Sequence, residues 1–275
     1  MLRILLLPGV CFGNFYSSSA QSVRRTVTAS YNGICAYSGE QADVLSFATN
    51  PAALPQTKNA GVAVYGERRF LLPELSRYAI NAGFTTTSGA FGWSMLHTGG
   101  GGYAETSAGI AYGRKLGARI SAGVQFNYYS IRASGYGQSA AISFAAGTLL
   151  TLTDKLRGGV CAINPAGGKF GKDHSEKLPS VYSLGLGYDA SQKCFIGMEI
   201  VKEEDLPVNV NAGVHYAFHQ RCFVRAGVAA VTGSFWAGAG LLVNAYRLDV
   251  ICNYHPQLGI SPGLLILFNI RRKQS

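Results

Sequence analysis

Apolar and polar residues alternate without a break along residues 208–218. One set of alternate positions carries only apolar side chains: Val208, Val210, Ala212, Val214, Tyr216 and Phe218. The positions between them carry polar or small residues: Asn209, Asn211, Gly213, His215 and Ala217. Side chains of a β-strand point alternately to its two faces, so this period of two predicts a strand with one apolar face.

The same period recurs from about residue 60 onward and predicts about fourteen strands. Their approximate centres are Val64, Ala82, Trp93, Ala108, Val124, Phe144, Val160, Leu186, Met198, Ala212, Gly227, Ala239, Val250 and Ile266. Short turns, such as 88–89 and 244–245, alternate with mostly longer loops, such as 68–76 and 164–179. This alternation is typical of antiparallel barrels in outer membranes, and an even strand count places both chain ends on the short-turn side.

Aromatic residues stand at the ends of several apolar faces. Examples are the pairs Tyr78/Phe84, Tyr182/Tyr188 and Tyr246/Tyr254. Rings at these positions are typical of the lipid headgroup level of a membrane barrel. The opposite faces mix Gly, Ser and Asn with a few charges. A soluble β-sandwich, the alternative, would carry Lys, Glu and Thr on its water-facing side. We therefore predict an all-β fold, a closed antiparallel transmembrane β-barrel.

The amino-acid composition agrees with the predicted membrane barrel. The chain has 275 residues, of which 48% are apolar and only 14% are charged, against about 25% charged residues in an average soluble domain. No apolar run approaches the roughly 18 residues that a spanning helix needs. The net charge of +10 is spread over short basic pairs such as Arg68-Arg69 and Arg114-Lys115. Such pairs favour contact with lipid headgroups, and we expect no nucleic-acid partner.

The chain divides into three parts. Residues 1–20 resemble a signal peptide, with Arg3 before an apolar core and small residues at 18–20; an ordinary first strand is the alternative. Residues 21–60 carry several aromatic and aliphatic side chains and few charges. A free tail would expose these side chains to water at a cost of about 1.5–3 kcal/mol each. We predict that residues 21–60 form a plug, or hatch, inside a barrel made of residues 61–275.

The sequence offers little catalytic or metal-binding chemistry. It contains no GxSxG, HExxH or P-loop motif. His215 and His219 share a strand face but stand about 13 Å apart, too far to share a metal ion. Six cysteines occur without CxxC spacing, so we expect neither a disulfide nor a metal site. We predict a non-enzymatic protein without a cofactor.

Charged residues occur at a few positions on the small-residue faces. An unpaired charge in a narrow lumen would be costly. We therefore expect a compensated lumenal cluster, the alternative being that each charge meets lumenal water. Its members are Glu105, Arg119, Glu199, Arg225, Arg247 and Asp249.

Two short motifs lie just before the first predicted strand. Asp43 and Ser46 precede the tripeptide Asn50-Pro51-Ala52, in which Asn50 can cap a short helix that starts at Pro51 and stops at Pro55. These residues resemble the N-terminal signature of the FadL-like outer-membrane family. The resemblance implies a barrel with an N-terminal hatch that admits hydrophobic small molecules.

The C-terminal end carries a second resemblance. Tyr254-His255, Leu258-Gly259, Ser261 and the apolar run 264–268 are similar to the last hairpin of PorV- and PorQ-type proteins. Those proteins belong to the same superfamily and serve the type IX secretion system of Bacteroidetes. One departure is that Phe268 is followed by two further residues and a basic tail, whereas many outer-membrane barrels end on an aromatic residue.

The two resemblances imply different functions. We expect first an outer-membrane accessory of protein secretion or surface attachment, with secretion-system proteins as partners. The alternative is a FadL-like channel for hydrophobic small molecules, with such a molecule as its ligand. Only the loop 164–179 is long enough to collect a ligand outside the barrel, and it is charged. Both hypotheses place the protein in the bacterial outer membrane, in contact with membrane lipid and lipopolysaccharide.

Overall fold

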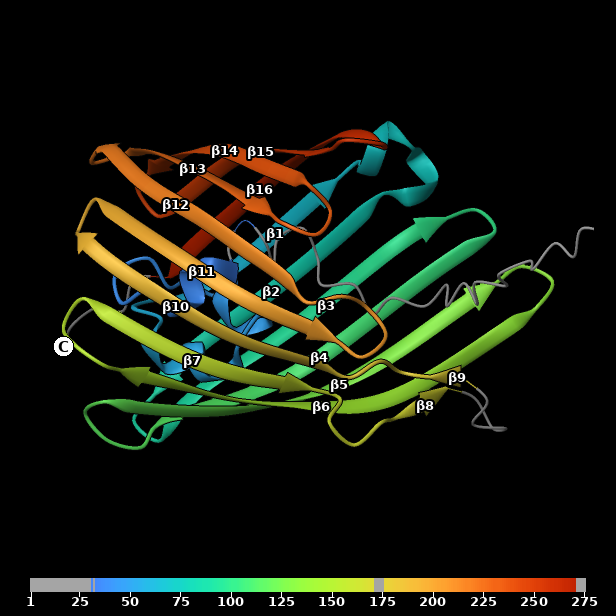
Figure 1. The fold of residues 1–275 in the computed structure, drawn as a ribbon, viewed down its shortest axis with the longest axis horizontal. Helices are drawn as coiled ribbons and strands as arrows, with labels where there is room; N and C mark the ends of the chain where they lie inside the picture. The colour runs from blue at the N-terminus through green and yellow to red at the C-terminus, as the bar shows by residue number, and fades with distance from the viewer. Residues whose placement is uncertain (1–30, 32, 171–175, 271–275) are drawn as a thin grey trace, which may run out of the picture.

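The computed structural model describes residue 31, residues 33–170 and residues 176–270, so the predicted signal peptide 1–20 and residues 21–30 of the predicted plug lie outside the described residues. The described chain forms a closed barrel in which every strand pairs antiparallel with its two neighbours (Figure 1). β1 pairs with β16 from Ala60↔Ile270 to Glu67↔Gly263 and closes the barrel. The first eight barrel strands are β1 (Ala60–Glu67), β2 (Arg77–Thr86), β3 (Gly89–Gly100), β4 (Tyr103–Lys115), β5 (Ile120–Ala133), β6 (Gly137–Thr151), β7 (Leu156–Ile163) and β10 (Val181–Ser191). The other six are β11 (Cys194–Glu203), β12 (Asn209–His219), β13 (Cys222–Ala229), β14 (Ser234–Val243), β15 (Tyr246–His255) and β16 (Gly259–Ile270).

Each of the fourteen strand centres predicted from the alternation lies in one of these fourteen barrel strands, so the fold class is confirmed. The sequence reasoning missed a small hairpin, β8 (Lys169–Phe170) with β9 (Glu176–Lys177), in the longest loop. Its strands have two residues each, which is too short for a period of two to show.

The outer face of the barrel is apolar along its whole circumference. Val64, Ile110, Phe126 and Val250 are each 49% exposed or more. Outward aromatic rings pair across neighbouring strands near the short-turn end, with ring centroids 5.6 Å apart for Phe84 and Phe91 and 4.9 Å apart for Tyr246 and Phe268. These rings lie at strand ends, as the sequence predicts for a girdle at the membrane interface.

The two ends of the barrel differ in their connections. Six short turns join strands at one end, and the longest connections, 68–76 and 164–180, lie at the other (Figure 1). The loop 68–76 contains η4 (Arg69–Leu71) and η5 (Pro73–Leu75). Within the described part of the chain, no helix has the length and apolar character that crossing a bilayer requires.

Candidate functional site

The described residues before β1 lie inside the barrel, where they appear as the blue segment in Figure 1. They contain three short 3-10 helices, η1 (Ile34–Tyr37), η2 (Ser46–Ala48) and η3 (Pro51–Gln56). We call the described part of this segment, Tyr31 and residues 33–59, the plug. Its largest side chains, Tyr31, Tyr37 and Phe47, are each 0% exposed. The plug therefore forms a core with the inner wall, as the apolar composition of residues 21–60 predicts.

Inward-facing glycines make room for the plug. A Cβ on Gly185 would stand 2.1 Å from Cζ of Tyr37, and one on Gly147 would stand 2.1 Å from Oδ1 of Asn50. On Gly197 it would stand 1.9 Å from Cγ2 of Ile34. Carbon atoms cannot approach so closely, so side chains at these positions would displace the plug. The inward glycines oppose one another across several strand pairs: Gly61↔Gly83, Gly113↔Gly123, Gly123↔Gly147, Gly159↔Gly185, Gly187↔Gly197 and Gly197↔Gly213.

The inner face is less uniformly small than the sequence reasoning assumed. Phe195, Ile251, Leu265 and Leu267 point inward and are each at most 1% exposed. They belong to the same cluster as Tyr31 and the plug residues Ile34, Val44 and Leu45. The alternation cannot distinguish an apolar side chain that faces lipid from one that faces a plug, because both side chains are removed from contact with water.

An ion-paired triad joins the plug to β15. Nη1 of Arg247 donates to Oδ2 of Asp43 at 2.6 Å, and Nη2 of Arg247 lies 3.1 Å from Oδ2 of Asp249. Arg247 is 6% exposed and Asp249 is 0% exposed. Charges removed from water to this degree need a close partner, so Arg247 serves both the barrel wall and the plug. Within the plug, Oδ1 of Asp43 also accepts from the backbone N–H of Leu45, and Ser46 Oγ accepts from the backbone N–H of Asp43.

Two further acidic side chains of the wall hold the stretch around η1. The Ser38 hydroxyl donates to Asp189 on β10 at 2.5 Å, and the backbone N–H of Gly39 donates to the same carboxylate at 2.9 Å. The hydroxyl of Tyr37 donates to Oε1 of Glu199 on β11 at 2.9 Å. The plug is thus attached through directed polar contacts, and no covalent bond to the wall is involved.

Asn50 attaches the plug to a different side of the wall. Its side-chain oxygen accepts from the backbone N–H of Ala52 at 3.0 Å and caps η3, with Pro51 at the first position. The predicted cap is therefore confirmed, although the helix continues through Pro55 to Gln56. The amide nitrogen of Asn50 donates to the carbonyls of Thr148 and Val160 at 3.3 and 3.1 Å. Those two residues oppose each other on β6 and β7, so Asn50 bonds to the seam between these strands.

The structure places four of the six predicted cluster residues against the plug. Arg247 and Asp249 form the triad with Asp43, and Glu199 binds Tyr37. Nε of Arg225 donates to Nδ1 of His215 at 3.0 Å, and its guanidinium lies 5.2 Å from the centre of the Tyr31 ring.

The remaining two predicted cluster residues lie elsewhere. Glu105 lies towards the long-loop end of β4 and accepts from the hydroxyl of Tyr103 at 2.6 Å. We expected Arg119 on a lumenal strand face, but it is exposed in the turn 116–119, because β5 begins one residue later at Ile120. The sequence reasoning also missed Asp43 as the partner of Arg247, and Asp189 and Tyr37 as plug contacts.

The predicted C-terminal hairpin residues lie at the long-loop end, away from the plug. Oγ of Ser261 accepts from the backbone N–H of Phe70, and the His255 ring packs edge-to-face on the Phe70 ring at 6.1 Å. Leu258 is the last residue of the turn between β15 and β16, Gly259 begins β16, and Tyr254 packs on Phe235 at 4.8 Å on the outer face. These residues therefore position the loop 68–76.

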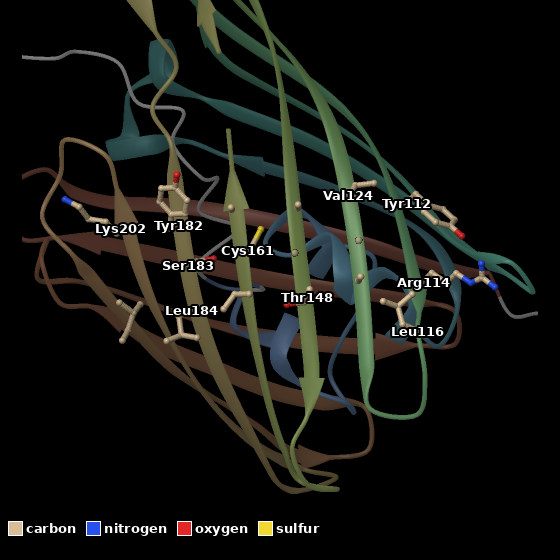
Figure 2. Close-up of a pocket in the computed structure, with 17 residues that line it drawn as sticks. Tyr112, Arg114, Leu116, Val124, Thr148, Cys161, Tyr182, Ser183, Leu184 and Lys202 are labelled. Carbon is tan, nitrogen blue, oxygen red and sulfur yellow. The ribbon is translucent and has the colours of Figure 1, made fainter. Parts of the chain in front are cut away.

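A groove of about 920 Å³ crosses the outer wall of the barrel over β4 to β7, β10 and β11. Figure 2 shows Tyr112, Arg114 and Leu116 at one end of it and Tyr182 and Lys202 at the other. Thr148 and Val160, the two residues whose carbonyls bind Asn50, form part of its lining.

The groove is separated from the lumen only by the backbone of β5 to β7, because small residues line both sides of the wall there. The inward residues Gly123, Gly147 and Cys161 also line the groove. A small lumenal cavity of about 60 Å³, between the plug and the wall, shares Cys161 as a lining residue. The plug and the outer groove therefore lie on opposite sides of the same stretch of the barrel wall.

The site consists of buried apolar packing and polar contacts between the plug and the wall. The described residues contain no group of three or more His, Cys, Asp or Glu side chains that could hold a metal ion. Burial raises the pKa of the Cys35 thiol and of the Tyr31 hydroxyl in the plug, so both groups stay protonated at neutral pH.

Comparisons with known proteins identify the fold. No protein-family model matches the chain, and no curated protein matches it. Among solved structures, the chain is similar to the CymD monoaromatic hydrocarbon channel, with a TM-score of 0.68 and 14% identity over 90% of this chain and 97% of that chain. The Ralstonia pickettii toluene transporter TbuX gives a TM-score of 0.59 and 10% identity, with 88% and 98% covered. The Pseudomonas putida toluene transporter TodX gives 0.54 and 10%, with 84% and 94% covered.

At these identities the likeness shows a shared fold. The three neighbours are barrels of the FadL-like kind, so the FadL-like fold expected from residues 43–52 is confirmed. All three are described as channels or transporters, and none is described as a secretion component.

Proposed function

We propose that this protein is a FadL-like, non-enzymatic channel of the bacterial outer membrane that admits hydrophobic small molecules. The observation that carries the proposal is the apolar groove in the outer wall, which lies directly behind the Asn50 attachment of the plug. The shared fold with hydrocarbon channels and toluene transporters supports it.

The closed lumen favours a hydrophobic substrate. Plug and wall residues pack together in three buried clusters, and this packing favours a lumen that is closed to hydrophilic solutes. A hydrophobic molecule needs no continuous water path, because it can partition into the bilayer at an apolar opening. At Gly123 and Gly147 the wall has no side chain for such a molecule to displace, but the strands are continuously paired there, so passage requires β5 and β6 to separate locally.

The attachment of the plug is suited to movement. Its polar contacts with the wall include those of the Asp43, Tyr37, Ser38 and Asn50 side chains. Each exchanges for contacts with water when the plug moves, which limits its net contribution to about 0.5–3 kcal/mol. We infer that a substrate arriving from the long-loop end displaces the plug locally and leaves through the groove.

The secretion accessory, our first expectation, rests on the resemblance of residues 254–268 alone. In this structure those residues position the loop 68–76, a role that any barrel of this fold could require. We therefore favour the channel over the accessory.

Uptake by whole cells tests the channel. The protein would be expressed in a host whose outer membrane lacks its own channel for hydrophobic compounds, and uptake of radiolabelled toluene and of a small sugar would be measured. We expect toluene uptake to rise and sugar uptake to stay at the level of the host.

A matched pair of variants locates the route. Ala146→Phe fills the groove, whereas Ala237→Phe places the same ring on the outer face of β14. We expect the first variant to reduce toluene uptake and the second to leave it unchanged. Toluene uptake equal to that of cells without the protein, together with co-purification of a secretion component, would overturn the proposal.

A further inference from the structure

The groove has a defined shape, set by the strand register. Five register pairs run straight across the strands from β4 to β11: Tyr112↔Val124, Val124↔Ala146, Ala146↔Ala162, Ala162↔Tyr182 and Tyr182↔Lys202. All six residues line the groove. The floor is made of alanines, and a tyrosine ring stands towards each end (Figure 2). The groove is therefore a trough that runs perpendicular to the strands.

The dimensions of the trough fit a single lipid chain. Six strands spaced about 4.8 Å apart make it about 24 Å long. One leaflet of a bilayer is about 15 Å deep, half of the hydrocarbon core. Because barrel strands tilt by about 40°, a line perpendicular to them is itself oblique to the membrane normal. An acyl chain of one leaflet can therefore lie along the part of the trough that begins at Arg114.

The two ends of the trough differ in charge. At the β4 end, Arg114 lines the trough, and Lys115 and Arg119 lie next to it at the short-turn end of the barrel. All three are exposed, and no hydrogen bond or ion pair joins their side chains to other residues in the described part of the chain.

At the β11 end, the cation that lines the trough, Lys202, already has a partner within the protein. The ammonium group of Lys202 donates to the carbonyl of Leu206 at 2.6 Å. The next three residues along the chain, Glu203, Glu204 and Asp205, are acidic, and one cation, Lys177, pairs with Glu204. An anion would be repelled here and attracted at the Arg114 end.

We propose that the trough binds one acyl chain of an anionic phospholipid from the leaflet on the short-turn side, and that its phosphate meets Arg114. An apolar trough with an unpaired cation at one end matches a molecule that carries an anion at one end of an apolar chain. A second barrel fits less well, because its wall is convex and cannot fill a narrow trough. The proposal needs the barrel to lie in a bilayer, but it does not need any transport.

Lipid binding measured by native mass spectrometry tests the proposal. The protein would be released from nanodiscs of phosphatidylglycerol or of phosphatidylcholine with the same acyl chains. We expect wild-type protein to retain one phosphatidylglycerol and to retain phosphatidylcholine much more weakly. The variant Arg114→Gln should bind phosphatidylglycerol about fivefold more weakly, because a cation near a membrane surface contributes about 1 kcal/mol. Its binding of phosphatidylcholine should not change.

A second pair of variants tests the trough itself. Ala162→Phe fills the floor and should abolish retention of the lipid, whereas Ala237→Phe, on the outer face of β14, should leave it intact. Equal retention of the two lipids, or retention that neither Ala162→Phe nor Arg114→Gln changes, would overturn the proposal. So would a lipid-free dimer that Ala162→Phe dissociates. A protein that retains the lipid but does not raise toluene uptake would overturn only the proposed function, so the two proposals fail separately.

Discussion

Asp43→Asn should release the plug without unfolding the barrel. The substitution removes the charge that Arg247 binds at 2.6 Å, while Arg247 keeps Asp249 at 3.1 Å. The asparagine oxygen can still accept from the backbone N–H of Leu45, so the local turn survives. A hydrogen bond between charged groups contributes about 2 kcal/mol, and losing it should raise the undocked fraction about 30-fold.

Cys35 provides the assay. Its thiol is 2% exposed, and burial raises its pKa, so the reactive thiolate is scarce while the plug is docked. In a variant whose only cysteine is Cys35, the rate of maleimide labelling at pH 8 should follow the undocked fraction. We expect the Asp43→Asn form of this variant to label about 30-fold faster than its parent.

The plug offers a matched control. Glu40 pairs with Lys58 at 2.8 Å, but the two side chains are 41% and 58% exposed. An exposed pair of this kind contributes about 0–1 kcal/mol, so Glu40→Gln should change labelling by less than about fivefold. Equal labelling rates in Asp43→Asn and Glu40→Gln would refute the argument that Arg247 anchors the plug.

Two further predictions concern the barrel and the space inside it. Gly185→Ala should speed Cys35 labelling, because its methyl group would meet the Tyr37 ring at 2.1 Å, whereas Gly66→Ala, with 3.7 Å to the Tyr78 ring, should not; a docked plug in Gly185→Ala would contradict the close fit. The protein should also migrate faster in SDS gels before boiling than after it, since a closed barrel leaves no strand edge free. A mobility that boiling does not change would contradict the closed barrel.

The strands could be predicted from the sequence because each one has a lipid face. A residue such as Val124 or Val214 alternates with inward Gly, Asn or His, and this period depends only on neighbours along the chain. The pair Arg247 and Asp249 could be predicted for the same reason, since residues two apart share a face. The cap of η3 by Asn50 is also local.

The contacts of the plug could not be predicted in the same way. Asp43 and Arg247 lie 204 residues apart, and nothing in the pattern selects Arg247 over other basic residues as the partner of Asp43. Asp189 follows the outward Tyr188, so its inward direction was readable, but its contact with Ser38 depends on where the plug lies. The groove depends on which outward alanines the register brings together, as with Ala146 and Ala162.

Reversible locking of the plug tests the account most directly. A Cβ on Gly197 would stand 1.9 Å from Cγ2 of Ile34, so cysteines at these two positions come within reach of a disulfide between plug and wall. The double variant Ile34→Cys/Gly197→Cys, without other cysteines, would be compared for toluene uptake in its oxidised and reduced forms. We expect uptake to stop in the oxidised form and to return on reduction, because the substrate must displace the plug. Equal uptake in the two forms would contradict a channel that the plug closes.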